Sequence, residues 1–268
     1  TLFVTSGQSG WRELNRVLLI QSFDEVIDAA TLRAKYPGAE GGLWGVWDAY
    51  MFRYIEERLA QQPKDRPLFI YAMSTTNHPP YELPSDYKPF AFDIQKWPGD
   101  KGSEHLIPNL QTYRYANDEL AKFLTTLAAS PAAASTLVAA TGDHNVRTFG
   151  QYAAPESQVL RQQVPFIVWG AGTLVCPSAL HQVGSHLDMF PTLFPLLGIG
   201  EGYLMTGRDL AKCPSKTDTA DAMAVTFIGQ ARSNHAIWNM GSANTLACQP
   251  VGSVCEWRAS QDAKARAR

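Results

Sequence analysis

Short, uninterrupted apolar runs that alternate with segments of helical periodicity constrain the fold of this chain most. Residues 67–73, 136–140 and 164–169 are such runs, and strands buried in a parallel sheet have this character. Residues 47–61 and 109–129 instead carry apolar side chains at helical spacing. This alternation predicts an α/β fold whose largely parallel sheet is flanked by helices. In the longer helix, we expect the inward face to comprise Tyr113, Ala116, Leu120, Phe123 and Leu127.

The two ends of the chain differ from its middle. Residues 1–5 are short and β-prone, and residues 186–197 are predicted to form a helix. After residue 205 the chain has short β-prone runs without helical periodicity, so we expect antiparallel strands there. The sequence thus predicts a main unit over residues 1–205, a small antiparallel subdomain over residues 206–260 and a frayed tail over residues 261–268.

Composition excludes two classes of protein. The chain carries 23 Lys and Arg against 25 Asp and Glu, a net charge of −2, whereas a protein that wraps nucleic acid has a basic excess. We therefore expect no nucleic-acid partner. A membrane span needs a run of about 20 apolar residues, and the sequence contains none.

The start of the chain and its cysteines bear on where the protein works. The first residue is Thr1, and no charged and apolar leader follows it, which predicts a piece of a longer protein with any membrane anchor upstream. Cys248 and Cys255 lie close enough in sequence to close a hairpin with a disulfide, and buried thiols fit equally well. The remaining cysteines are Cys176 and Cys213.

The first candidate site is Gly142-Asp143-His144, directly after the apolar run 136–140. Ligands of open α/β sheets bind at the carboxyl ends of strands. A carboxylate beside an imidazole can reach one metal ion, and the glycine permits a tight turn. On these residues alone, an Asp143 that caps a turn and a His144 at the surface are the simpler interpretation.

The second candidate site is the segment 75–81, directly after the apolar run 67–73. Here Asn77 and His78 can donate hydrogen bonds to an anionic oxygen, and a protonated histidine can stabilise a leaving group. A polar turn imposed by the two prolines that follow would give the same pattern. The segment opens a Pro-rich loop over residues 74–108, and loops of such length are commonly functional.

A third candidate is Arg16, within the amphipathic segment 11–21. Arginine is the usual bidentate ligand of phosphate and sulfate, although an exposed helix arginine is the more common case. Each candidate can be dismissed singly. The two polar clusters that follow strands, however, are expected to share one rim of the sheet.

The order of these segments resembles the sulfatase family of the alkaline-phosphatase superfamily, and within it the branch of lipoteichoic-acid-synthase-like and phosphoglycerol-transferase-like proteins. The T-N-H-x-P-[FY] loop of that branch matches residues 76–81, and its Gly-Asp-His motif matches residues 142–144. Its D-x-x-P-T helix start matches residues 188–192, and an N-R segment near the start matches residues 5–26. The resemblance extends over about residues 3–240.

The resemblance implies attack on a phospho- or sulfo-ester with one divalent metal ion. Asp143 and His144 match two metal ligands, and such a mixed oxygen and nitrogen set favours Mn²⁺ or Zn²⁺ over Ca²⁺ or Mg²⁺. His78 matches the histidine that contacts the substrate anion or protonates the leaving group. Arg16 and Asn77 match residues that contact the head group.

The resemblance also implies that part of the catalytic domain precedes this chain. The nucleophile and the first acidic metal ligand of the family lie upstream, and neither Thr5 nor Ser6 is a good substitute, so the isolated chain is expected to be inactive. Arg147 is expected to face solvent, and Asp188 to cap a helix rather than bind metal. His186 can approach the site, but we expect it to serve the helix start.

Three functions remain open at this point. The leading one is transfer or hydrolysis of phosphoglycerol- or phosphoethanolamine-type head groups in the cell envelope, with a phospholipid or glycan head group as partner. Sulfate-ester hydrolysis is the second, and a non-catalytic periplasmic binding domain is the third. Relatives in this branch imply an extracytoplasmic location, at the periplasmic face of the inner membrane, with the membrane reached only through an upstream anchor.

Overall fold

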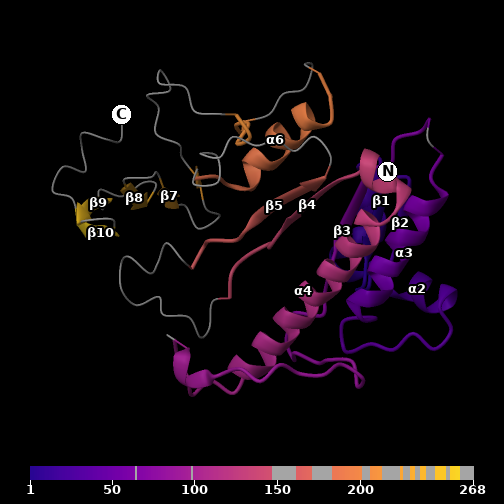
Figure 1. Ribbon diagram of the computed structural model, residues 1–268, viewed down its shortest axis with the longest axis horizontal. Helices are drawn as coiled ribbons and strands as arrows, with labels where there is room; N and C mark the ends of the chain where they lie inside the picture. Colours follow the sequence, from indigo (N-terminus) through magenta and orange to yellow (C-terminus); the bar gives the residue numbers. More distant parts are fainter. Residues whose placement is uncertain are drawn as a thin grey trace. The chain divides into compact units, whose positions relative to one another are not determined.

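The computed structural model consists of two compact units, Thr1–Ala134 and Ser135–Arg268 (Figure 1). We describe each by itself. The residues that the structure describes are 1–63, 65–97, 99–146, 161–170, 183–200, 206–212, 224–225, 230–232, 236–239, 245–251 and 254–259. The tail expected over residues 261–268 lies outside them, as does Arg147.

The first unit is built on a parallel sheet of three strands in the order β2-β1-β3. Its strands are β1 (Leu2–Thr5), β2 (Glu25–Ile27) and β3 (Ile70–Met73). The register pairs Leu2 with Glu25 on one side and with Ile70 on the other. The parallel sheet predicted from the apolar runs is thus confirmed here, and its central strand β1 is completely buried.

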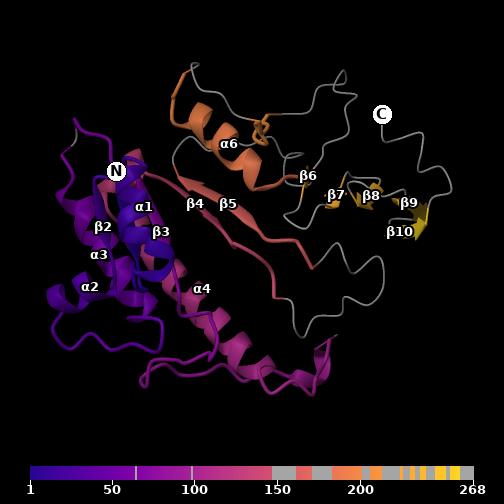
Figure 2. The same cartoon turned by 180° about the vertical axis from the view of Figure 1, so that it is seen from behind.

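Helices connect and cover these strands (Figure 2). The predicted helices at 47–61 and 109–129 are α3 and α4, and Met51 and Ile55 of α3 face the core. On α4 the expected inward face is correct for Phe123 and Leu127, but Tyr113 is 53% exposed and Thr112 is buried instead. The helices of this unit are α1 (Leu14–Ile20), α2 (Ala29–Lys35), α3 (Asp48–Gln61) and α4 (Leu106–Ala128), with 3-10 turns at Trp11–Glu13, Ile94–Lys96 and Pro131–Ser135.

The second unit begins with two strands that correct one expectation. Strands β4 (Leu137–Thr141) and β5 (Phe166–Gly170) form where the apolar runs predict them, but they pair antiparallel, with Leu137 opposite Gly170. Their residues are half-buried or exposed rather than fully buried, and the same holds for β3. An apolar run indicates that a strand can be buried. The direction of the strand depends on the segment that connects it to its neighbour and on the strand with which it pairs.

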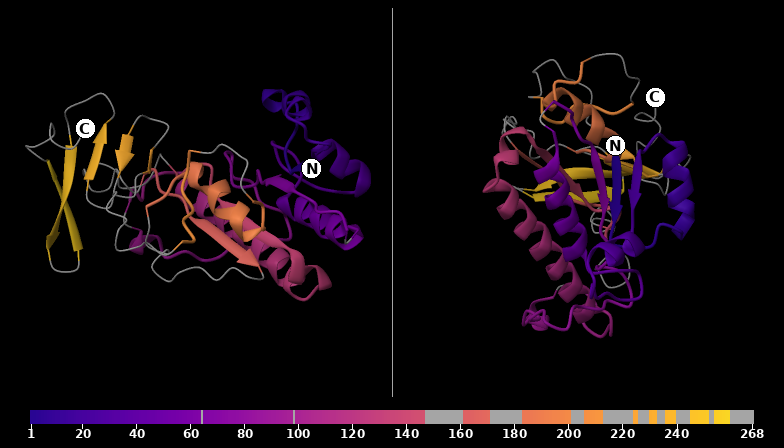
Figure 3. Two further views of the ribbon diagram at one scale, coloured as in Figure 1. Left: turned by 90° about the horizontal axis from the view of Figure 1, so that it is seen from above. Right: turned by 90° about the vertical axis from the view of Figure 1, so that its right-hand side faces the viewer.

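After these strands come a helix and an antiparallel sheet, as predicted. A 3-10 turn, His186–Asp188, leads into α6 (Met189–Leu196). Five strands then pair antiparallel in the order β10-β9-β8-β7-β6, the last two of the chain drawn in yellow in Figure 3. The strands are β6 (Ala224–Val225), β7 (Gln230–Arg232), β8 (Ala236–Asn239), β9 (Thr245–Val251) and β10 (Val254–Ala259).

Two further observations concern cysteine and membrane expectations. In the β9–β10 register, Cys248 lies opposite Trp257 and Cys255 lies opposite Pro250, so the two cysteines are not direct cross-strand partners. Within the described ranges, no helix has the length and apolar character needed to cross a membrane.

Candidate functional site

The loop that carries Asn77 and His78 leaves the carboxyl end of β3 and is held by one buried carboxylate. Asp48, the first residue of α3, accepts a hydrogen bond from the backbone N–H of Thr75 at 2.9 Å and from that of Thr76 at 3.3 Å. The Thr76 hydroxyl in turn accepts from the Asp48 N–H at 3.2 Å. The start of α3 therefore fixes the backbone just ahead of His78.

Asp48 also binds the end of β1. The Ser6 hydroxyl donates to Asp48 Oδ1 at 2.6 Å and lies 2.8 Å from the Thr75 hydroxyl. Burial raises the pKa of Asp48, while the hydrogen bonds from Ser6, Thr75 and Thr76 act in the opposite direction. Thr5 and Ser6 are both completely buried, so neither hydroxyl is placed as an accessible nucleophile, in line with the expectation from sequence.

Asn77 is oriented by α4. Its side-chain oxygen accepts a hydrogen bond from the Thr112 hydroxyl at 2.9 Å and from the Asn109 amide at 3.4 Å. With the oxygen engaged on the helix, the NH₂ group of Asn77 is left to donate elsewhere. Such an arrangement suits contact with an anionic oxygen.

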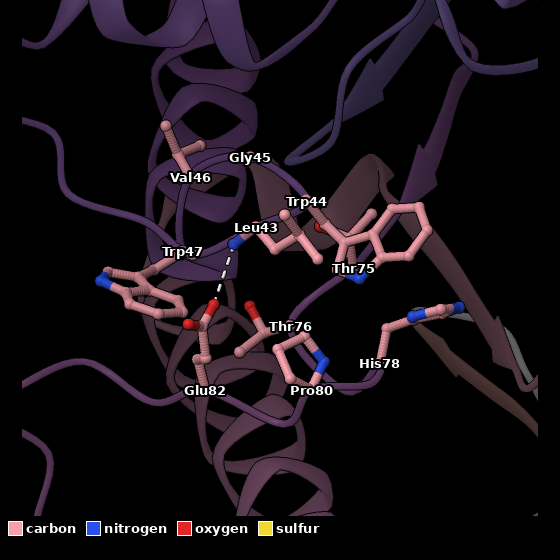
Figure 4. A pocket seen from close by; sticks show the side chains of 11 residues that line it. Leu43, Trp44, Gly45, Val46, Trp47, Thr75, Thr76, His78, Pro80 and Glu82 are labelled. Atoms are coloured by element: carbon pink, nitrogen blue, oxygen red, sulfur yellow. Dashed lines mark hydrogen bonds between the residues drawn. The ribbon is translucent and has the colours of Figure 1, made fainter.

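His78 is fixed by an aromatic contact. The rings of Trp44 and His78 have centroids 4.2 Å apart and meet edge to face, and Figure 4 shows both at one side of a pocket. Trp44 Nε1 donates to the Pro79 carbonyl at 2.6 Å, and His78 Nδ1 donates to the same carbonyl at 3.1 Å. Nδ1 thus carries a hydrogen and is engaged with the backbone, so Nε2 is the ring nitrogen left to contact a ligand.

The Trp44 segment reaches this position through a glycine. A Cβ at Gly45 would lie 2.0 Å from the Ser6 carbonyl oxygen, so only glycine allows this close approach. The Val46 N–H donates to that same carbonyl at 2.9 Å. On the far wall of the pocket, the Leu43 N–H donates to Glu82 Oε2 at 2.9 Å, the dashed line in Figure 4.

Arg16 lies on α1 and is 69% exposed. Its Nε donates to Glu13 Oε2 at 2.9 Å, and its hydrogen bonds in the described part of the chain go to Glu13 rather than to the His78 loop. Two residues just ahead, Arg12 and Glu13, have φ of 50° and 54°, a conformation that costs non-glycine residues about 1 kcal/mol or more each. Arg16 is therefore on the surface, with its charge already paired.

In the second unit, Asp143 and His144 follow β4 on an exposed turn. The side chains are 89% and 50% exposed, and the His144 N–H donates to Asp143 Oδ1 at 2.8 Å. His144 Nδ1 donates to the Asn145 carbonyl at 2.9 Å, so Nε2 keeps its lone pair. A Cβ at Gly142 would lie 3.2 Å from Val164, which explains the glycine by close packing.

This turn has a donor geometry that fits a metal ion. Asp143 Oδ2 and His144 Nε2 are 3.6 Å apart, and two ligands of one tetrahedral ion with bonds near 2.1 Å lie about 3.4 Å apart. One carboxylate and one imidazole form an oxygen and nitrogen set of the kind that Mn²⁺ or Zn²⁺ accepts. The described residues bring no third His, Cys, Asp or Glu to this pair, so they offer a metal ion at most these two side chains.

His186 and Asp188 stand beside this turn in different roles. His186 opens the 3-10 turn that leads into α6, and its Nε2 donates to the Gly142 carbonyl at 2.9 Å, so it also braces the turn. Asp188 is buried and accepts from the backbone N–H of Ser185 and of Arg208, each at 2.8 Å. Asp188 thus has the helix-capping, backbone-binding role that the sequence predicts for it.

Reasoning from sequence missed the residues that hold the His78 loop. Asp48 follows a tryptophan at the start of a periodic helix, where an acidic residue is unremarkable. Thr112 is a small polar residue among apolar neighbours on the inner stripe of α4. A polar residue at a buried helical position is the one signal that could have indicated a hydrogen-bonded partner.

Comparison with known proteins agrees with the fold and with the motifs. The family model described as Sulfatase matches residues 1–199. Lipoteichoic acid synthase-like YvgJ of Bacillus subtilis (strain 168) is 26% identical over 226 residues, which cover 80% of this chain and 34% of that protein. The chain thus spans about a third of the length of this relative.

Solved structures show the same architecture. A protein of the alkaline phosphatase superfamily from Vibrio parahaemolyticus superposes with a TM-score of 0.74 at 23% identity, over 96% of this chain and 60% of its own. The lipoteichoic acid synthase LtaP from Listeria monocytogenes gives 0.66 at 18% identity, over 89% and 59%. These likenesses show an alkaline-phosphatase-like fold. Because the family model covers well over half of the sequence, the chain belongs to the sulfatase family.

Proposed function

We propose that this chain is part of a metal-dependent enzyme that transfers or hydrolyses phosphoester head groups in the cell envelope, of the phosphoglycerol or phosphoethanolamine type. One observation carries the proposal: Asn77, with its amide free to donate, and the His78 ring are held in fixed positions by Asp48, Thr112 and Trp44. Preset donors stabilise negative charge that develops on an oxygen without reorganising in the reaction. The lipoteichoic acid synthase-like relative supports a phosphoester over a sulfate ester.

Each candidate residue has a defined task in this proposal. Asp143 and His144 would hold a divalent metal ion, which when bound activates a nucleophile and withdraws charge from the ester oxygens. The Asn77 amide would donate to an anionic oxygen. His78, protonated at both ring nitrogens, would donate from Nε2 to the same anion or pass a proton to the leaving group. Arg16 would exchange Glu13 for the head-group phosphate.

The setting of the enzyme belongs to the same proposal. Residues 1–205 would form the C-terminal part of the catalytic domain, with residues 206–260 as a small subdomain and the nucleophile upstream of Thr1. The partner would be a phospholipid or glycan head group at the extracytoplasmic face of the membrane. An upstream segment would supply the contact with the membrane.

The test uses the full-length protein that contains this chain. Wild type, His78→Ala, Asp143→Ala and His144→Ala are assayed with phosphatidylglycerol and with p-nitrophenyl sulfate in the presence of MnCl₂ or ZnCl₂. We expect turnover of the phospholipid, lost about 100-fold or more in each variant. A control, Asp93→Ala, changes an exposed carboxylate in the first unit and should leave turnover unchanged.

The outcome separates the three functions. Turnover of the sulfate ester alone would replace the proposal with a sulfatase. Full activity in both metal-ligand variants would remove the metal assignment. A protein that turns over neither ester but still binds lipid head groups would be a binding domain.

A further inference from the structure

A cavity of about 640 Å³ lies within the first unit, and none of Arg16, Asn77 and His78 lines it. It is open to solvent on one side and is bordered by the loop 84–91 and by helices α3 and α4. Aromatic and charged side chains line it, and its size is typical of cavities that bind small molecules. The aromatic lining residues are Trp47, Tyr50, Tyr87, Phe90 and Tyr115.

The walls of this cavity are preset, because the loop is bonded to α4. Tyr87 donates from its hydroxyl to Asp118 Oδ2 at 2.7 Å, and the Phe90 N–H donates to Gln111 Oε1 at 2.9 Å. The Arg114 guanidinium lies 5.1 Å from the centre of the Phe90 ring. Phe90 is nevertheless 49% exposed, so part of its ring remains open to a ligand.

The charges around the cavity are balanced. Arg114 pairs with Asp118 at 2.8 Å, and Lys122 pairs with Glu119 at 2.5 Å. Of the other lining charges, Asp86 and Lys88 form no ion pair with any described residue, and they have opposite signs. An anionic ligand would meet as many carboxylates as cations here. A neutral ligand with many hydroxyl groups meets donors and acceptors of both kinds.

Trp47 contributes its ring to the wall and not its N–H. Trp47 Nε1 is out of contact with solvent and makes no hydrogen bond with the described residues. Figure 4 shows the indole nitrogen of Trp47 directed away from the pocket of His78 and Glu82.

We propose that this cavity binds a neutral carbohydrate. Sugar rings would lie against the faces of Phe90 and Tyr50, while their hydroxyl groups would bond to Asp86 and Lys88. Aromatic faces with a few polar groups around them bind a ring that has apolar C–H faces and a polar rim. The inference goes beyond the proposed reaction and does not depend on it, because no candidate metal ligand lines the cavity.

Saturation-transfer NMR on the chain tests the proposal with two neutral probes, the β-1,4-linked tetrasaccharides of glucose and of N-acetylglucosamine. We expect transfer to the ring protons of at least one of them. Phe90→Ala should weaken its binding about 5- to 10-fold, since one aromatic contact is lost. Phe69→Ala, directly before β3, is the matched control, because Phe69 is 44% exposed, lies outside the cavity and should leave binding unchanged.

Further variants and conditions make the result of this experiment decisive. Asp86→Ala removes an acceptor for the sugar hydroxyls, so it should weaken binding about 2- to 5-fold without altering the NMR fingerprint of the fold. Binding should persist in EDTA and in Asp143→Ala, which keeps this inference separate from the proposed reaction. The proposal is overturned if neither tetrasaccharide shows transfer, if Phe69→Ala and Phe90→Ala lose binding equally, or if inorganic phosphate displaces the sugar.

Discussion

The two strand-end clusters that the sequence singles out are held in different ways. The Asn77–His78 loop is bonded to β1, α3 and α4 through groups far away in sequence, among them Ser6, Asp48 and Thr112. The Asp143–His144 turn is held by bonds between neighbouring residues and by a distant brace, His186. Both candidate pairs are exposed, but the first is anchored to buried groups of the core, whereas the bonds of the second are to exposed neighbours.

The difference has a physical reason. Donors that meet an anionic substrate must be oriented before the substrate arrives, because their effect depends on fixed dipoles. Metal ligands can be ordered by the ion itself, since metal binding supplies free energy to the site. Mutations in the loop supports should therefore act on stability, and mutations in the turn on metal affinity.

The largest expected effect is the loss of folding stability in Asp48→Ala. In Asp48→Ala, the Ser6 hydroxyl and the N–H groups of Thr75 and Thr76 lose their acceptor in a buried place, at a cost of about 3–5 kcal/mol in the free energy of unfolding. Urea denaturation measures it. Asp143→Ala removes an 89% exposed carboxylate and should cost less than about 0.5 kcal/mol. Equal losses in the two variants would contradict the comparison.

Next in size is the loss of metal affinity at the turn. Calorimetric titration of the chain with ZnCl₂ or MnCl₂ should show weakening of about 100-fold or more in His144→Ala, while the urea midpoint stays unchanged. In the proposed site the imidazole is one of only two candidate ligands among the described residues, so little affinity should remain. His105→Ala alters an exposed histidine of the first unit and serves as the control. Unchanged affinity in His144→Ala would show that the turn is not the metal site.

The pH dependence of stability sharpens the description of Asp48. Burial raises the pKa of this carboxyl in the folded state above its ordinary value of 3.8, so the folded chain holds this proton more tightly than the unfolded chain. The contribution to stability is present below pH 3.8 and declines as pH rises through the folded-state pKa, by about 1.4 kcal/mol for each unit of difference.

Asp48→Asn has no titrating carboxyl at this position, so comparison with it isolates the contribution of Asp48 to the pH dependence of stability. The difference in unfolding free energy between wild type and Asp48→Asn should drift against the wild type as pH rises from 3.8, and then level off. Denaturant titrations at several pH values measure it. A difference that moves in favour of the wild type over this range would show that the hydrogen bonds to the carboxylate outweigh its burial.

The smallest effect is expected at the brace of the turn. His186→Ala removes the donor to the Gly142 carbonyl, and we expect about a 10-fold loss of metal affinity, at the lower end for residues that support metal ligands. Replacement by Gln, which can also donate, should restore part of it. If His186→Ala weakens metal binding as much as His144→Ala does, His186 is itself a ligand.

Much of the architecture could be predicted from local patterns. The positions of β3, β4 and β5, the helices α3 and α4, and the antiparallel end of the chain all follow from periodicity and apolar runs. The motif residues Asn77, His78, Asp143 and His144 follow from polar residues placed just after strands. These features depend on residues that are near one another in sequence.

Other features were decided by contacts between distant residues. The antiparallel pairing of β4 with β5, the exposure of Tyr113 and the burial of Asp48 beneath the His78 loop have no local signature. The sequence by itself determined the family, the elements and the residue types of the candidate site. Only the tertiary structure decided how those residues are held, because a side chain's burial and partners depend on segments that the chain brings together after dozens of intervening residues.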